Sequence, residues 1–140
     1  MLRRRPPLPE ELRPAWTAFL DSADALAGAR RRLLATLPAG RVEPGPVGLG
    51  IDAMAAAIDV ARALLPVWRD QPDEQVWRAC ATGLDDAAAV LPAARAVALD
   101  SRELDDLIGA FADVVDPLDA FADAERAWRR TWKVTAVTRG

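Results

Sequence analysis

The chain has 140 residues and a formal net charge of −3, and 51% of its residues are hydrophobic and 28% charged. This length suits one domain with a single core. The sequence contains no His and one Cys, which excludes nucleophiles activated by His, zinc sites built from His or several thiolates, and an internal disulfide bond. The 18 basic residues do not outnumber the 21 acidic ones, so we expect no general nucleic-acid-binding face.

The two ends of the sequence differ from its middle. Residues 1–8 form a basic, proline-rich leader that we expect to be disordered, since no apolar stretch of a secretory signal follows its arginines. Residues 9–133 are predicted to form one helical-bundle domain, and residues 134–140 a C-terminal tail. No run of apolar residues is long enough for a membrane span, and we expect a cytoplasmic protein without a membrane partner.

The first predicted helix lies near residues 9–37. Apolar residues recur in it at alternating spacings of four and three, which places them on one face and forms a seam for packing against other helices. The seam residues are Leu12, Trp16, Phe19, Ala23, Leu26, Arg30, Leu33 and Leu37. The charged member is Arg30, for which we expect a salt bridge to Asp105 or Asp106.

The next two helices are predicted near residues 48–69 and 72–98. A loop of about ten residues, rich in Pro and Gly, precedes the first of them. The sequence Pro72-Asp73-Glu74 is typical of the first turn of the second. The same spacing gives seams of Ile51, Met54, Ile58, Ala61, Leu65 and Trp68, and of Trp77, Cys80, Leu84, Ala87, Leu91, Ala94 and Ala98.

The fourth helix is predicted near residues 101–133, where Asp100–Glu103 resembles a capping box. Pro92 in the third helix and Pro117 in the fourth are expected to kink them, because Pro lacks a backbone N–H and clashes one turn back. As an alternative, a fifth helix begins at Pro117. The seam residues are Leu104, Leu107, Phe111, Val114, Leu118, Phe121, Glu125, Trp128 and Trp132.

Short connections between the last three helices make neighbours antiparallel, so the sequence predicts an all-α, up-down-up-down four-helix bundle. At about 1.5 Å of rise per residue, every Trp falls at the end opposite the long loop. The fourth helix is expected to outrun the second by roughly 15 Å, which would leave Trp128 and Trp132 without a partner from it. The rings either fill a splayed end of the core or form a contact surface.

Glu125 is the charged residue in the fourth seam, close to the tryptophans. A carboxylate in that place needs a cation or hydrogen bonds. Arg13, Arg69 and Arg78 are expected at a similar position along the axis of the bundle. One interpretation is a structural ion pair. The other is a pocket of Trp rings and Glu125 that holds a cationic ligand through cation–π contacts.

These patterns favour a non-enzymatic bundle that acts through self-association, or by docking into a larger assembly, with its Trp-rich end as the contact surface. The alternative is a small-molecule-binding protein, or an enzyme without His, with its pocket at the same end. Neither hypothesis needs a cofactor or a metal. The candidate ligand- or partner-binding residues are Trp16, Trp68, Trp77, Glu125, Trp128, Trp132, Arg13 and Arg78.

Overall fold

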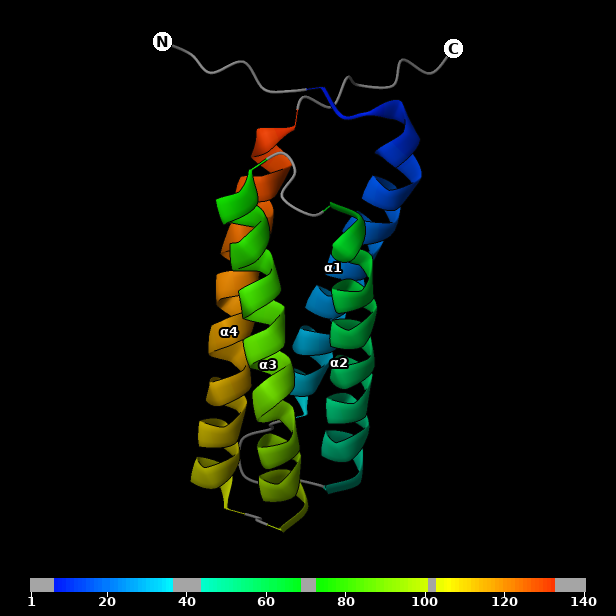
Figure 1. Ribbon diagram of the computed structural model, residues 1–140. Coiled ribbons are helices and arrows are strands. Elements are labelled where there is room, and N and C mark those ends of the chain that lie inside the picture. Colours follow the sequence, from blue (N-terminus) through cyan, green and yellow to red (C-terminus); the bar gives the residue numbers. More distant parts are fainter. Residues whose placement is uncertain (1–6, 37–43, 69–72, 101–102, 133–140) are drawn as a thin grey trace.

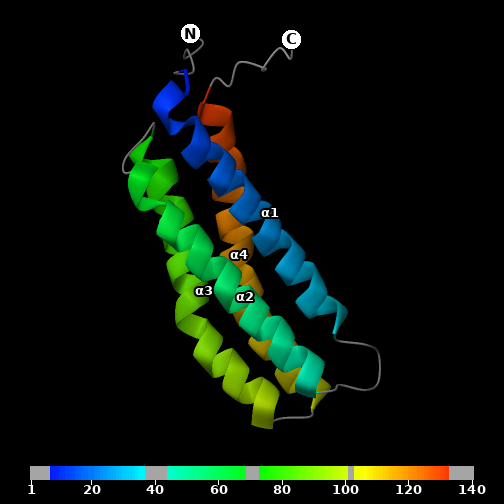
Figure 2. The ribbon, with the colours of Figure 1, turned by 90° about the vertical axis from the view of Figure 1, so that its right-hand side faces the viewer.

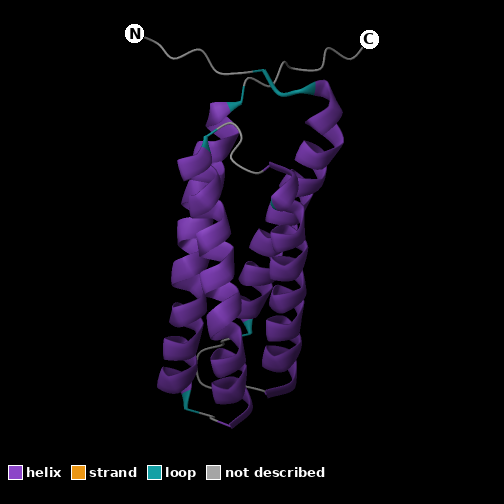
Figure 3. Cartoon of the chain, viewed as in Figure 1, coloured by secondary structure: helices purple, strands orange, loops and turns teal. Residues whose placement is uncertain are grey.

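The computed structural model describes residues 7–36, 44–68, 73–100 and 103–132, and they form an up-down-up-down bundle of four helices (Figure 1). The sequence-based prediction of the fold is thereby confirmed. The described ranges contain helix and loop and no strand (Figure 3). The helices are α1 (Arg13–Ala35), α2 (Pro44–Leu64), α3 (Glu74–Asp100) and α4 (Leu104–Thr131), with 3₁₀ turns η1 (Glu10–Leu12) and η2 (Pro66–Trp68).

Three helices do not begin where the sequence predicted. α1 begins at Arg13, after η1, instead of near residue 9. α2 begins at Pro44 instead of residue 48, because Pro is tolerated in a first turn, where its missing N–H has no intrahelical partner. α4 begins at Leu104, with Glu103 at the N-cap position rather than at the third helical position that a capping box requires. The start of α3 is close to the prediction, and the side chain of Asp73 accepts a hydrogen bond of 2.9 Å from the backbone N–H of Gln75.

The two internal prolines do not end their helices. α3 continues through Pro92 and α4 through Pro117, so the alternative of a fifth helix beginning at Pro117 is wrong. Each Pro removes one backbone hydrogen bond, but the apolar seam is buried on both sides of it, and this packing holds the helix together. The degree of bending at each Pro stays a prediction.

The predicted seams form the core. Phe19, Ile58 and Leu84 are fully buried, and most other seam residues that the structure describes are buried as well. The clearest exception is Leu104, which is 36% exposed at the first position of α4. Leu37 and Arg69 lie outside the described residues. Leu8, which the sequence assigned to the leader, is buried in the core.

The register between α1 and α4 differs from the predicted one. Arg30 pairs with Asp119 at 2.8 Å rather than with Asp105 or Asp106, so this prediction is wrong. The predicted register sets both helices level at the end of the bundle that carries the long loop, here called the loop end. α1 stops short of the other helices there (Figure 2), because a long connection lets it end early.

The most extensive close approach of backbones is between α3 and α4. It depends on Gly83, where an added Cβ would lie 2.9 Å from the backbone nitrogen of Phe121. Contacts between α1 and α4 are made instead by large rings and by ion pairs. Among the described residues, none of the helices combines the length and the apolar character needed to cross a membrane.

Candidate functional site

Four tryptophans, from α1, from η2 and from the end of α4, meet at one end of the bundle, which we call the Trp end. Trp128 of α4 lies at the centre of the cluster, with its ring centroid 5.5 Å from that of Trp16 and 5.1 Å from that of Trp68. Phe19 is closer still, at 4.7 Å. All three contacts are edge-to-face, the arrangement that aromatic quadrupoles favour. Trp132 completes the cluster at 5.9 Å from Trp68.

These contacts overturn the predicted overhang of the fourth helix. Trp128 and Trp132 both contact Trp68, which follows α2 in η2. The prediction failed because α2 begins earlier and α4 begins later than predicted, so the two are closer in length than expected.

The rings of the cluster expose almost no surface. Trp68 and Trp128 are 0% exposed, Trp132 is 4% and Trp16 is 6%. The structure therefore matches the first of the two interpretations, in which the rings fill the core. A binding role for these rings stays a prediction, and it would require the Trp end to open.

Trp77 lies apart from this cluster and is half-buried. Its indole Nε1–H donates a 2.9 Å hydrogen bond to the backbone carbonyl of Leu65, at the end of α2. The ring lines a groove of about 520 Å³ between α2 and α3, together with Pro66 and Ala81. Trp77 thus helps to fasten the start of α3 to the end of α2.

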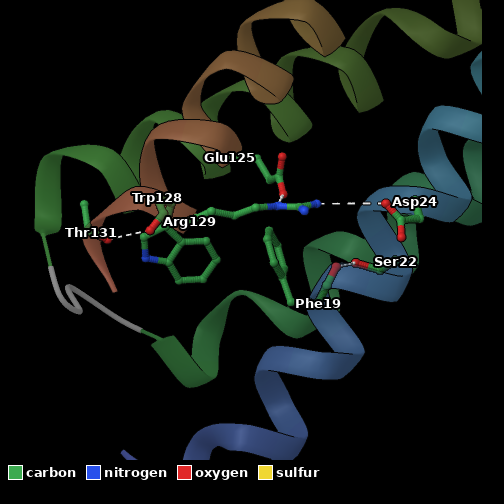
Figure 4. A network of polar contacts seen from close by, with 7 residues as sticks. All are labelled: Phe19, Ser22, Asp24, Glu125, Trp128, Arg129 and Thr131. Atoms are coloured by element: carbon green, nitrogen blue, oxygen red, sulfur yellow. Dashed lines mark hydrogen bonds and ion pairs between the residues drawn. The ribbon is translucent and has the colours of Figure 1, made fainter. Parts of the chain in front are cut away.

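Glu125 is buried, with 6% of its surface exposed, and its carboxylate pairs with Arg129 one turn later in α4. Figure 4 shows the Arg129 guanidinium between Glu125 and Asp24 of α1, with 3.9 Å between Arg129 Nη2 and Asp24 Oδ1. A carboxylate at this depth needs such a partner. The prediction that Glu125 belongs to an ion pair is confirmed, but its partner was not among the arginines considered.

The two predicted arginine partners that the structure describes lie elsewhere. Arg13 is exposed at the first position of α1. Arg78 is exposed and pairs with Glu74 on its own helix at 2.5 Å. The structure therefore does not bring Arg13 and Arg78 together with Glu125. Arg129 could have been found from the sequence, because it stands four residues after Glu125, the spacing at which helical side chains meet.

Cys80 of α3 is fully buried close to this network. Burial raises the pKa of its thiol to about 12, and the negative charge of Glu125 contributes to the increase. Only the thiolate is nucleophilic, so this environment disfavours Cys80 as a nucleophile. It acts as a small apolar residue of the core.

A groove of about 310 Å³ runs between α1 and α4 beside Glu125. Its apolar surface includes Leu26 and Phe121, and Arg30, Arg126 and Arg129 stand along it. Each of these arginines is already paired with a carboxylate, on Asp119, Asp123 and Glu125 respectively. The groove could hold a small molecule with an apolar body and one charged group, at the cost of one of these pairs.

The outer face of α2 is apolar and uncovered. Five residues form this α2 stripe, at successive spacings of four, three, four and three: Leu49, Ala53, Ala56, Val60 and Ala63. Leu49 is 73% exposed and Val60 is 53% exposed, and the three alanines are exposed as well. The spacing is the one that marks the buried seams, so α2 carries two apolar faces, of which one has no partner among the residues that the structure describes. The sequence contains this signal, but a prediction of one seam for each helix leaves it out.

Within the described ranges, no three Cys, Asp or Glu side chains are grouped as a metal site requires. Comparison of the chain with protein-family models, with curated proteins and with solved structures found no match.

Proposed function

We propose that this protein is a non-enzymatic association module that binds a second copy of itself through the α2 stripe. One observation carries the proposal: an apolar surface with the spacing of a helix-packing seam faces solvent along α2. Exposed apolar patches of this kind mark interaction sites on soluble proteins. The spacing of four and three is suited to a helix as the occupant, since such seams pack against other helices at a shallow angle.

The proposal keeps the function expected from the sequence and moves the contact surface. The Trp end was the expected surface, but its rings are covered by their own chain. The α2 stripe is short and rich in Ala, so it covers less area than a standard interface, and the association should be weak and reversible. The proposal also places the protein in the cytoplasm, where a free cysteine such as Cys80 stays reduced.

Sedimentation velocity over a wide range of protein concentration tests the proposal. We expect the wild type to pass from monomer to dimer as concentration rises. Ala56→Asp places a charge in the stripe and should abolish the dimer without unfolding the chain. Ala120→Asp is the matched control, because Ala120 is also exposed in the middle of a helix with acidic neighbours. A wild type that is monomeric throughout, or equal behaviour of the two variants, contradicts the proposal.

A second candidate function is supported by the groove between α1 and α4, where a buried carboxylate lies beside apolar surface. In this function the groove binds a small amphipathic molecule, and Glu125 or Arg129 exchanges its present partner for the charged group of the ligand. Titration with phenylbutyrate and with phenylbutylamine tests it, with the indole NMR signal of Trp128 as the readout. A saturable shift with one of the two probes supports the function, and no shift with either contradicts it.

A further inference from the structure

We infer that the two copies pair through α2 in an antiparallel, two-fold arrangement centred on Ala56. The inference rests on the proposed self-association. It adds the direction of pairing, and the side-chain sizes and charges that favour this direction. In a two-fold contact both copies use the same patch, so the patch must be complementary to itself. The α2 stripe meets this condition in one direction of pairing better than in the other.

The order of large and small residues in the stripe favours the antiparallel direction. Centred on Ala56, this pairing sets Leu49 against Ala63 of the second copy and Val60 against Ala53 of the second copy. Each large side chain then faces a small one, and Ala56 meets its own equivalent, so the helices can approach closely. A parallel pairing would set Leu49 against Leu49 and Val60 against Val60, and would leave gaps between the alanines. Interfaces are packed as densely as protein interiors, which disfavours such gaps.

The charges beside the stripe fit the same arrangement. Asp52 pairs with Arg95 of α3 at 3.3 Å. Asp59 is two turns further along the same face of α2 and is exposed, and no ion pair of Asp59 is present among the described residues. Antiparallel two-fold pairing brings the same flank of both helices together, so that Asp59 of the second copy comes level with Asp52. These two carboxylates repel each other, and Arg95 between them offsets the repulsion and joins the copies at both ends of the contact.

The position of the other exposed apolar residues favours a closed dimer over a growing chain of copies. Within the described ranges, Leu34, Leu99, Leu104 and Ile108 are exposed near the loop end, on three different helices. On α3, the exposed residues Ala89, Pro92, Ala96 and Leu99 repeat the spacing, but over a shorter stretch than the α2 stripe. A membrane surface is a poorer occupant, because the flank of the stripe carries Asp52 and Asp59 and binding to anionic lipids needs basic residues.

Cross-linking with single cysteines and a short bis-maleimide tests the orientation. Leu49 and its equivalent would lie about 21 Å apart in the antiparallel pair, fourteen residues at 1.5 Å each. Ala56→Cys should therefore link to itself, and Leu49→Cys and Ala63→Cys should each fail to do so. A mixture of these last two variants should give a linked heterodimer. The wild type is the control, since its buried Cys80 should not react.

Each outcome of the cross-linking experiment decides between arrangements. Self-linking of all three variants indicates a parallel pair and overturns the inference while the proposed self-association stands. Absence of links in every sample, with dimers visible by sedimentation, shows that a face other than α2 is used. Absence of both links and dimers overturns the proposed function as well.

Reversal of the Arg95 charge tests the electrostatic part separately. We expect Arg95→Glu to raise the dimer dissociation constant roughly threefold to fivefold, the size of effect that exposed ion pairs produce. Arg126→Glu is the matched control, because Arg126 is exposed and paired with a carboxylate on α4, away from the stripe. Equal dissociation constants for the two variants would remove Arg95 from the interface.

Discussion

The Trp end and the outer face of α2 are both apolar, but the chain uses them in opposite ways. The Trp end gathers the largest side chains and covers them with one another. The outer face of α2 consists of plain Leu, Val and Ala residues and is left uncovered. The difference teaches that an uncommon residue type does not mark a binding surface when those residues pack against one another. An apolar period that remains exposed after folding is the better guide.

The comparison also separates stability from association. Burial of large rings in edge-to-face contact stabilises the bundle, so substitutions at the Trp end should change the free energy of unfolding. Exposed residues of the α2 stripe bury little surface in the monomer, so substitutions there should change the dissociation constant and leave the monomer stable.

The largest effect is expected from Trp128→Ala at the centre of the ring cluster. Removal of a fully buried indole leaves a cavity beside Trp16, Trp68 and Phe19, and should lower the free energy of unfolding by about 3–5 kcal/mol. Urea denaturation monitored by circular dichroism measures this loss. Trp128→Phe keeps part of the ring contact and should lose less. A loss below about 1 kcal/mol for the alanine variant would mean that the Trp end is not a tightly packed core.

High pH should lower the free energy of unfolding, because Cys80 is buried as a neutral thiol. Its thiol has a pKa of about 12 in the folded chain and 9.0 as the ordinary value, so the unfolded chain releases this proton first. The free energy of unfolding is therefore unaffected by this group below about pH 9. Above that pH it decreases by about 1.4 kcal/mol for each pH unit, until the folded thiol also ionises. The sequence has no Tyr that would obscure the measurement.

Urea denaturation at increasing pH, with Cys80→Ala as the reference, isolates this effect. By about pH 11 the wild type should have lost about 2–3 kcal/mol more than the variant. Parallel curves for the two proteins would show that the thiol is accessible to solvent in the folded state.

A smaller loss is expected from Glu125→Gln. The amide still accepts a hydrogen bond from Arg129, but the charge-assisted part is lost, and the free energy of unfolding should fall by about 1 kcal/mol. Asp123→Asn is the control, because the Asp123–Arg126 pair is exposed on both sides and should contribute little. If Glu125→Gln raises stability instead, the carboxylate is held for a ligand, and the groove between α1 and α4 becomes the leading site.

Periodicity alone predicted the core of this protein. Most described seam residues are buried, including Glu125, because on a helix one buried face follows directly from the spacing. The relative heights of the helices were predicted poorly. The prediction paired Arg30 with Asp105 or Asp106, but Arg30 pairs with Asp119. The long connection after α1 allows this helix to end short of its neighbours at the loop end.

The candidate site was predicted in part. The gathering of Trp16, Trp68, Trp128 and Trp132 at one end follows from helix direction and length. Their burial depends on how closely the side chains pack, and the spacing of apolar residues along the sequence does not predict this. The prediction for Glu125 placed its partner on another helix, whereas Arg129 is one turn away on the same helix. The exposed stripe of α2 was missed because its residues are small and common.

The smallest expected effect is in Trp fluorescence. This measurement compares the Trp end and the α2 stripe most directly. In Trp77→Phe, which removes the half-buried ring, the signal comes from the four tryptophans of the Trp end. We expect emission at short wavelength and little quenching by iodide, because these rings are at most 6% exposed. The quenching should not change as the protein is concentrated, since association through α2 leaves the Trp end as it was. Strong quenching in dilute protein that disappears on concentration would show that copies meet through the Trp end, and it would assign the contact surface to the rings rather than to α2.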